Sequence, residues 1–373
     1  MNKILRIACS LALMVSASAA NADIVFRAAP SEPAPFISNI VLYKNFGEFL
    51  KDESGGELSI QVIGPEIADG RGMKSALDSG LIDIGNLLPL MQPSALPQTA
   101  SMGELAMAGI NPQAIAAAMT DYILNCAKCV AEFDKNGWVF VGSNSTDIYV
   151  LATTKPVRTL ADLQGMRIRS PGAPYARWAE SVGAAPVSIP FSETYEAMTQ
   201  GVIDGAMVSV NALVDMRLMD VAKYVIEIPL GAYTPTSNFT VRKAAWNKMT
   251  DDQKRVFIRA ADRSSTAYVQ VGYLDSAVRA RKASADKSIE FIVPEEEVLK
   301  HTRDFVASQI EHIPDLMKND YGIEDGAEKV SSYVSLLEKW VPFVEEAAGD
   351  WEKLAARRYE QIWDKVDLAT YGK

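Results

Sequence analysis

The chain has few of the side chains that bind metal ions or carry out nucleophilic chemistry. Its 373 residues include only three cysteines and two histidines. The histidines, His301 and His312, lie in a charged region that is predicted to be helical, far from the cysteines in sequence. The sequence also lacks a nucleophile elbow, a histidine-rich segment and a motif of paired carboxylates. We therefore expect no metal site and no cofactor, and we find no catalytic residues that would make this chain an enzyme.

Long apolar runs and an excess of positive charge are absent as well. Beyond the N-terminus, no segment reaches the roughly 18 uninterrupted apolar residues that a membrane-spanning helix needs. The formal charge of −10 argues against a general nucleic-acid binder, because such proteins neutralise phosphates with lysine and arginine. It does not exclude a small anionic ligand, since one local arginine can dominate a small cleft.

The N-terminus has the pattern of a secretory signal peptide. Lys3 and Arg6 supply the basic region, residues 7–15 are mostly apolar, and residues 20–22 form a small-x-small cleavage site. We expect residues 1–22 to be removed, which leaves the mature chain free in the periplasm.

Two cysteines follow the signal peptide, in the sequence Cys126-Ala127-Lys128-Cys129. In an oxidising compartment such a pair is expected to form a disulfide. The alternative is a redox-active thiol pair, which usually lies at the N-terminus of a helix. Residues 114–124 predict a helix that ends at the pair, and no thioredoxin-like strand precedes it. We therefore favour a structural disulfide.

Strand-like and helix-like segments alternate in the N-terminal part of the chain. Three short apolar runs predict strands, and the two segments between them have helical periodicity. The strands are predicted at residues 23–29, 58–63 and 81–86, and the helices at residues 36–52 and 72–80. This βαβαβ order predicts an α/β fold with a mostly parallel sheet.

The segment from Lys155 to Gly172 carries the most specific local pattern. Thr159 and Asp162 form a capping box that starts a short helix. The following alternation of apolar and polar residues predicts a strand that ends at Arg169, just before a Pro-Gly turn. An arginine in this position lies where open α/β sheets bind ligands, and its planar fork suits a carboxylate. The alternative role is an ion pair with a surface acid, and the flanking pattern favours ligand binding for Arg169 but not for Arg167.

This segment resembles a run found in the solute-binding proteins of tripartite ATP-independent periplasmic (TRAP) transporters. The shared residues are Lys155-Pro156-Val157, Thr159, Asp162-Leu163, Gly165, Arg169 and Pro171-Gly172. The resemblance implies an α/β, two-lobed periplasmic binding protein fold with mostly parallel mixed sheets, crossing strands and a long lobe-spanning helix. It also implies that Arg169 grips the carboxylate of a small organic acid and that the protein delivers this ligand to a TRAP membrane permease.

The resemblance covers residues 23–320 and divides them into two lobes, each entered twice by the chain. The first lobe is expected to contain residues 23–148 and 236–276, and the second lobe residues 149–235 and 277–325. Residues 326–373 exceed the usual family length and predict a C-terminal extension of two helices, at 330–346 and 351–366. We expect their apolar faces to pack on the second lobe of a monomer, with a dimer contact as the alternative.

The candidate ligand-binding residues lie at strand ends of both lobes and on the crossing strands. They are Asn86, Tyr149, Arg169, Ser209, Asn211, Ser237 and Asn238, with Tyr175 and Trp178 as an aromatic wall. Turn capping is the alternative role for the polar residues, and helix packing is the alternative for Tyr175 and Trp178. Phe191 is expected to pack beneath its loop without touching the ligand.

The chain departs from the members of the family that bind sugar acids. Those members resemble it around Arg169 but carry a second arginine near the position of Tyr149. Leu87 and Leu88 also occupy positions where a polar residue often contacts such ligands. One cation in a more apolar lining predicts a monocarboxylate, such as an aromatic or branched-chain acid, rather than a sugar acid.

Two other functions are compatible with the sequence. A binding protein of an ATP-driven transporter, or a sensory binding protein, would share the fold class, and only the segment 155–205 argues against it. A periplasmic thiol–disulfide oxidoreductase would use Cys126 and Cys129.

Overall fold

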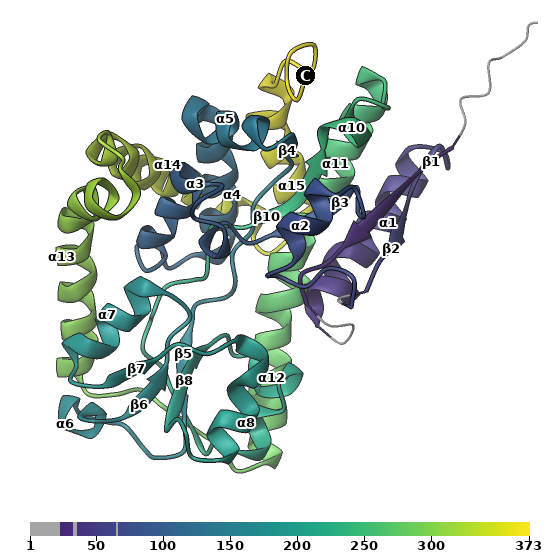
Figure 1. The fold of residues 1–373 in the computed structure, drawn as a ribbon. Helices are drawn as coiled ribbons and strands as arrows, with labels where there is room; N and C mark the ends of the chain where they lie inside the picture. The colour runs from purple at the N-terminus through teal and green to yellow at the C-terminus, as the bar shows by residue number, and fades with distance from the viewer. Residues whose placement is uncertain (1–22, 33–35, 65) are drawn as a thin grey trace, which may run out of the picture.

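The computed structural model describes residues 23–32, 36–64 and 66–373, and it builds them around two separate sheets (Figure 1). The predicted signal peptide, residues 1–22, lies outside the described residues.

The first lobe is built on a five-stranded sheet with the order β2-β1-β3-β10-β4. Its strands are β1 (Ile24–Ala29), β2 (Leu58–Val62), β3 (Ile84–Leu87), β4 (Trp138–Phe140) and β10 (Ser237–Arg242). Strand β1 is parallel to β2 and β3, whereas β10 is antiparallel to β3 and β4. Strand β3 begins three residues later than predicted, because Leu81 is 47% exposed and Asp83 accepts hydrogen bonds from Arg27.

The second lobe is built on a six-stranded sheet with the order β11-β9-β5-β8-β6-β7. Its strands are β5 (Val150–Thr153), β6 (Arg167–Arg169), β7 (Ala185–Val187), β8 (Gly205–Val208), β9 (Tyr224–Ile226) and β11 (Glu290–Ile292). Strand β5 is antiparallel to both of its neighbours, β8 and β9. Each sheet therefore has one antiparallel strand, which enters from the other lobe, and the expected mixed sheets with crossing strands are confirmed.

Helices cover both sheets and bury an apolar core in each lobe. The helices around the first sheet are α1 (Lys44–Glu53), α2 (Met73–Asp78), α3 (Pro97–Ala100), α4 (Pro112–Asn125), α5 (Ala127–Lys135), α10 (Lys243–Trp246) and α11 (Asp251–Ala267). Those around the second sheet are α6 (Leu160–Leu163), α7 (Ala173–Ser181), α8 (Thr194–Thr199), α9 (Ala212–Asp215), α12 (Asp275–Asp286) and α13 (Glu296–Tyr321). The second sheet has a separate core on each face, one against α7 and α13 and one against α8, α9 and α12.

A long helical segment joins the lobes, as expected. Helix α11 begins at a capping box of Thr250 and Gln253 and continues through a π-helical segment, Tyr268–Leu274, directly into α12. Figure 1 shows this segment running from the first lobe, at the top of the view, to the second lobe below.

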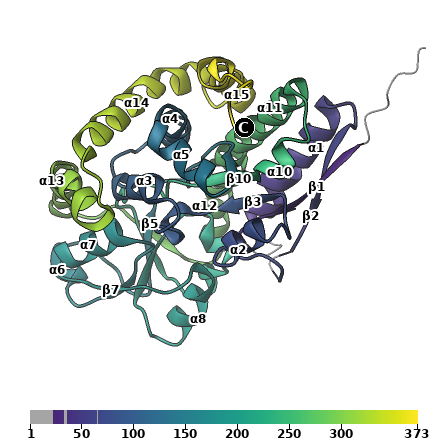
Figure 2. The same cartoon turned by 45° about the horizontal axis from the view of Figure 1, so that its top comes forward.

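The C-terminal extension consists of α14 (Gly326–Ala347) and α15 (Trp351–Gln361), and it packs on the first lobe. Figure 2 shows α14 arching over α4, while α15 lies against α11. The expectation that these helices cover the second lobe was wrong, because Trp340 and Trp363 are buried in the core of the first lobe. Helix α14 also continues through Pro342, where an interruption was expected.

No single helix among the described residues is long and apolar enough to cross a membrane. Helices α4 and α5 meet the length and composition requirement only as a pair, which is bent by 77°. Helix α4 is almost entirely buried within the first lobe.

Candidate functional site

A cavity of about 550 Å³ lies between the two lobes. Two extended segments that connect the lobes, residues 141–149 and 227–236, contribute to its wall through Asn144, Thr146, Tyr233 and Thr236. We call these two segments the connecting strands. Hydrogen bonds join them to each other, including Tyr149 N to Gly231 O at 2.7 Å and Tyr233 N to Thr146 Oγ1 at 2.9 Å. Connections of this kind are where two-lobed proteins bend when they open and close.

Arg169 is placed in this cavity by the end of strand β6. The side chain is only 6% exposed, and its guanidinium carbon lies 5.5 Å from the centre of the Phe191 ring. Its Nη1 donates to Met207 O at 3.2 Å and its Nε to Ile189 O at 3.5 Å, whereas Nη2 has no hydrogen-bond partner among the described residues. Burial lowers the pKa of this guanidinium, as expected for a cation that is removed from water.

No carboxylate oxygen of a described residue lies within 4.0 Å of the Arg169 guanidinium nitrogens. Arg167, two residues earlier on the same face of β6, instead forms an ion pair with Asp204, with Nε and Oδ2 3.0 Å apart. A buried cation without a paired anion is unfavourable, and it leaves donors available for an anionic ligand. The structure thus separates the two arginines as the sequence pattern suggested, with only Arg169 lining the cavity.

Acidic groups line the same cavity. Burial raises the pKa of Glu32 to about 7, and the charge of Arg169 partly opposes this rise. Burial also raises the pKa of Asp215 to about 6, although Asn211 Nδ2 donates to its Oδ2 at 2.9 Å. Ser209 Oγ in turn donates to Asn211 Oδ1. These carboxyl groups can take up a proton near neutral pH, which limits the negative charge that an anionic ligand would meet.

Aromatic rings make up much of the remaining wall. Phe36 of the first lobe contacts Phe191 of the second lobe edge to face, with ring centres 5.9 Å apart. Tyr268 and Tyr273 also line the cavity, and their hydroxyl oxygens are 3.4 Å apart. Flat apolar rings around a buried cation suit an organic acid with a flat or apolar body.

Five of the nine predicted site residues line the cavity, namely Asn86, Tyr149, Arg169, Ser209 and Asn211. The buried Oδ1 of Asn86 has no hydrogen-bond partner among the described residues, which leaves it available to a ligand.

The other four predicted residues do not line the cavity. Ser237 Oγ accepts from Thr240 Oγ1 at 2.7 Å, and Asn238 Nδ2 donates to Ser265 Oγ at 2.7 Å, so both are used inside the first lobe. Trp178 packs against α13 and donates from Nε1 to Thr302 at 3.1 Å. Tyr175 lies behind Tyr149, with ring centres 5.6 Å apart. The helix-packing alternative therefore describes the surroundings of Trp178 and Tyr175 better than the aromatic-wall prediction.

Several lining residues are not predicted by the sequence. Phe191 was expected to lie beneath its loop, but it lines the cavity next to Arg169. Tyr268 and Tyr273 are five residues apart, a spacing that places side chains on different faces of an α-helix. The π-helical segment, with its i→i+5 hydrogen bonds, brings them to one face. The only signal for this in the sequence is the pair of tyrosines themselves.

The cysteine pair lies away from the cavity, where α4 ends at Asn125 and α5 begins at Ala127. The sulfur atoms of Cys126 and Cys129 are joined as a disulfide. The expectation that the pair only follows a helix was wrong, because Cys126 is also the N-cap of α5 and accepts from Cys129 N at 3.1 Å. In the described parts of the chain, no three His, Cys, Asp or Glu side chains are grouped so that they could hold a metal ion.

Comparison with known proteins decides the family. The model of the family described as "Bacterial extracellular solute-binding protein, family 7" matches residues 38–314. The chain belongs to this family. Among curated relatives, a solute-binding protein of Albidiferax ferrireducens is 35% identical over 106 residues, or 28% of this chain and 31% of the relative. The 2,3-diketo-L-gulonate-binding periplasmic protein of Escherichia coli is 23% identical over 237 residues, or 60% of this chain and 68% of the relative.

The first curated relatives are matched over only 39%, 31% and 43% of their own lengths. Solved structures are matched more completely. A marine-metagenome TRAP solute-binding protein specific for aromatic acids, in complex with 3-hydroxybenzoate, has a TM-score of 0.74 at 22% identity, covering 86% of this chain and 99% of that one. A TRAP protein of Bordetella bronchiseptica with bound mandelate has a TM-score of 0.71 at 21% identity, covering 85% of this chain and 99% of that one. These likenesses establish that this family 7 protein has the two-lobed fold of TRAP solute-binding proteins.

Proposed function

We propose that this protein is a periplasmic solute receptor that binds a monocarboxylate through Arg169 and delivers it to a TRAP membrane permease. The observation that carries the proposal is the guanidinium of Arg169, which is buried, faces the cavity between the lobes and has no acidic partner among the described residues. A carboxylate bound there would complete the ion pair and receive two parallel charge-assisted hydrogen bonds.

The cavity lining supports an aromatic or otherwise flat acid as the ligand. Arg71 is the other cation of the lining, but it lies exposed at the surface, so a second buried cation for a dicarboxylate is not found among the described residues. Phe36, Phe191 and the tyrosines offer faces and edges on which a ring can pack. The volume of about 550 Å³ lies within the usual range for small-molecule sites. Structural relatives with bound 3-hydroxybenzoate and mandelate make these acids the first ones to test.

The test is a thermal-shift screen of the chain without residues 1–22. The panel contains benzoate, 3-hydroxybenzoate, mandelate, branched-chain 2-oxo acids and, for contrast, sugar acids such as gulonate. A ligand at one hundred times its Kd stabilises a protein by about 2.7 kcal/mol, which such a screen detects. A shift with aromatic or branched-chain acids that is lost in Arg169→Ala supports the proposal. The screen is repeated after unfolding and refolding, which removes any ligand retained from expression. If none of the acids raises the Tm of either the native or the refolded protein, the proposal is contradicted.

The thiol–disulfide oxidoreductase is the second candidate, because Cys126 caps a helix and Lys329 Nζ lies 3.5 Å from its sulfur. A helix N-terminus and a nearby lysine are both typical surroundings of redox-active cysteines. An insulin-reduction assay tests it. Turnover that disappears in Cys126→Ser would favour this function over that of a simple receptor.

A further inference from the structure

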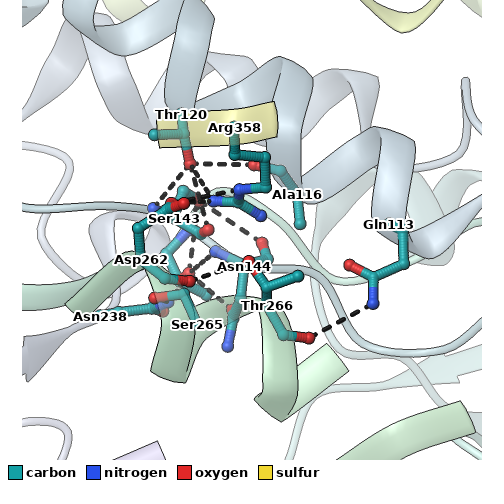
Figure 3. Close-up of polar contacts among 11 residues, drawn as sticks. Gln113, Ala116, Thr120, Ser143, Asn144, Asn238, Asp262, Ser265, Thr266 and Arg358 are labelled. Carbon is teal, nitrogen blue, oxygen red and sulfur yellow. Dashed lines mark hydrogen bonds and ion pairs between the residues drawn. The ribbon is translucent and has the colours of Figure 1, made fainter. Parts of the chain in front are cut away.

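The C-terminal extension is anchored by a fully buried ion pair. Arg358 of α15 is 0% exposed and Asp262 of α11 is 2% exposed. The Nη2 and Nε atoms of Arg358 lie 2.8 Å and 3.1 Å from Asp262 Oδ1 (Figure 3). Burial raises the pKa of Asp262, and the charge of Arg358 opposes this rise.

This pair is not arranged for maximum stability. Among the described residues, Arg358 Nη1 has no hydrogen-bond partner, and Asp262 Oδ2 has none beyond the side chain of Trp363, which lowers the pKa of Asp262. Buried ion pairs that are incompletely hydrogen-bonded are often no more stabilising than apolar residues of the same volume. An arginine buried in this way therefore suggests a role beyond holding α15 in position.

The second contact of Arg358 leads towards the cavity. Its Nη2 donates to Thr120 Oγ1 of α4 at 3.3 Å. The same oxygen accepts from Ser143 N at 3.0 Å, and its hydrogen can go to Ser143 O at 3.2 Å or to Ala116 O at 2.9 Å. Thr120 thus joins the extension to Ser143, which lies near the start of the first connecting strand (Figure 3).

Ser143 in turn holds the two connecting strands together. Its Oγ accepts from Thr236 N at 3.1 Å on the second connecting strand. Thr236 Oγ1 accepts from Asn144 N at 2.8 Å and lies 2.7 Å from Asn144 Oδ1. Asn144 and Thr236 both line the cavity. An unbroken series of buried hydrogen bonds therefore runs from Arg358 to the cavity wall, through Thr120 and Ser143.

We infer that Arg358 is a positioning residue, through which the C-terminal extension fixes the connecting strands and sets the shape of the ligand cavity. A buried network whose connecting members are hydrogen-bonded favours one geometry of the groups it joins, since any shift would leave a donor or acceptor unpaired. The family model matches residues 38–314, so α14 and α15 lie beyond the matched residues. The effect on ligand binding rests on the proposed function, whereas the effect on the connecting strands does not.

The test measures amide hydrogen exchange of the ligand-free protein in peptides covering residues 140–149 and 231–238. Thr120→Val removes the link between Arg358 and Ser143 but leaves the contact between Arg358 and Asp262. The pair Arg358→Met with Asp262→Leu removes both charges together, so that no single charge is left buried. We expect exchange in both peptides to become at least tenfold faster in each variant.

Lys339→Met is the matched control. Lys339 also ties the extension to α4, through Asp121 Oδ2 at 2.6 Å, but it has no contact with the network around Ser143. We expect this variant to lower the Tm without accelerating exchange in the two peptides. Equal acceleration in the control, or wild-type exchange in both network variants, would overturn the inference, since either result would leave Arg358 with a purely structural role.

Affinity provides the second readout, with 3-hydroxybenzoate as the probe. The network variants should bind it at least fivefold more weakly, and Lys339→Met should bind it like the wild type. Unchanged affinity together with faster exchange would refute the influence on the cavity. If 3-hydroxybenzoate fails to bind the wild type, the proposed ligand class is in doubt, while the exchange experiment still decides the role of Arg358.

Discussion

Removal of the Arg169 side chain should weaken ligand binding far more than it weakens the fold. A carboxylate held by two hydrogen bonds from this guanidinium gains roughly 1.5–3 kcal/mol net from each. The lower end corresponds to about 3 kcal/mol for the pair, or roughly a hundredfold in Kd. We expect Arg169→Ala to raise the Kd at least tenfold, because water can replace at most one of the two hydrogen bonds to the carboxylate. Arg169→Lys should also bind more weakly, because a point charge cannot reproduce the planar fork.

The ligand-free protein should tolerate the same change. The side chain is buried with only two carbonyl partners and one ring contact, so its loss also removes the cost of burying a cation. We expect the Tm without ligand to move by only a few degrees. Titration calorimetry gives the Kd, with Arg167→Ala as the control, since Arg167 lies on the same strand but pairs with Asp204 at the surface. Unaltered affinity in Arg169→Ala, or equal losses in both variants, would refute the placement of the carboxylate.

Three further predictions concern the cavity and the cysteine pair. Because the pKa of Glu32 is raised to about 7, its ionisation above that pH should place a competing anion near Arg169. Titrations across pH should therefore show weaker acid binding as the pH rises through 7, and Glu32→Gln should flatten this dependence. Phe191→Ala, which removes the ring 5.5 Å from the Arg169 guanidinium, should lower affinity for aromatic acids about two- to tenfold and spare small aliphatic acids, as calorimetry would detect. Reduction of the Cys126–Cys129 disulfide, whose cysteines are 3 residues apart, should lower the unfolding free energy by about 2 kcal/mol, measured as a drop in Tm with dithiothreitol.

The fold follows from patterns that are local in the sequence. The alternation of strands and helices from residue 23 onward specifies a parallel sheet, and the capping box at Thr250 marks the start of the long helix that joins the lobes. The capping box of Thr159 and Asp162 is likewise present, with both of its reciprocal hydrogen bonds. The capping boxes depend on residues three apart, and each strand or helix depends on a short periodic run, so these elements can be predicted without knowledge of the rest of the chain.

The predicted residues that line the cavity lie near the ends of strands, with Tyr149 just before the first residue of β5. Arg169 ends β6, Ser209 directly follows β8 and Asn86 is the last but one residue of β3, and all three line the cavity. Ser237 and Asn238 are the first two residues of β10, and their side chains form hydrogen bonds within the first lobe. The sequence also does not predict the π-helical segment that brings Tyr268 and Tyr273 to one face.

The placement of the C-terminal helices shows a different limit. Their apolar faces predicted that a partner surface exists, but an apolar face packs equally well on either lobe or on another chain. Two ion pairs also join the extension to the first lobe: Arg358 pairs with Asp262, and Lys339 pairs with Asp121. Arg358 occupies the position four residues after Leu354, which is 2% exposed, so it lies on the buried face of α15. A charged residue on a buried helix face needs a buried partner of opposite charge, because without one the helix could not pack there. This requirement makes Arg358 a better guide to the packing partner of α15 than the apolar residues beside it.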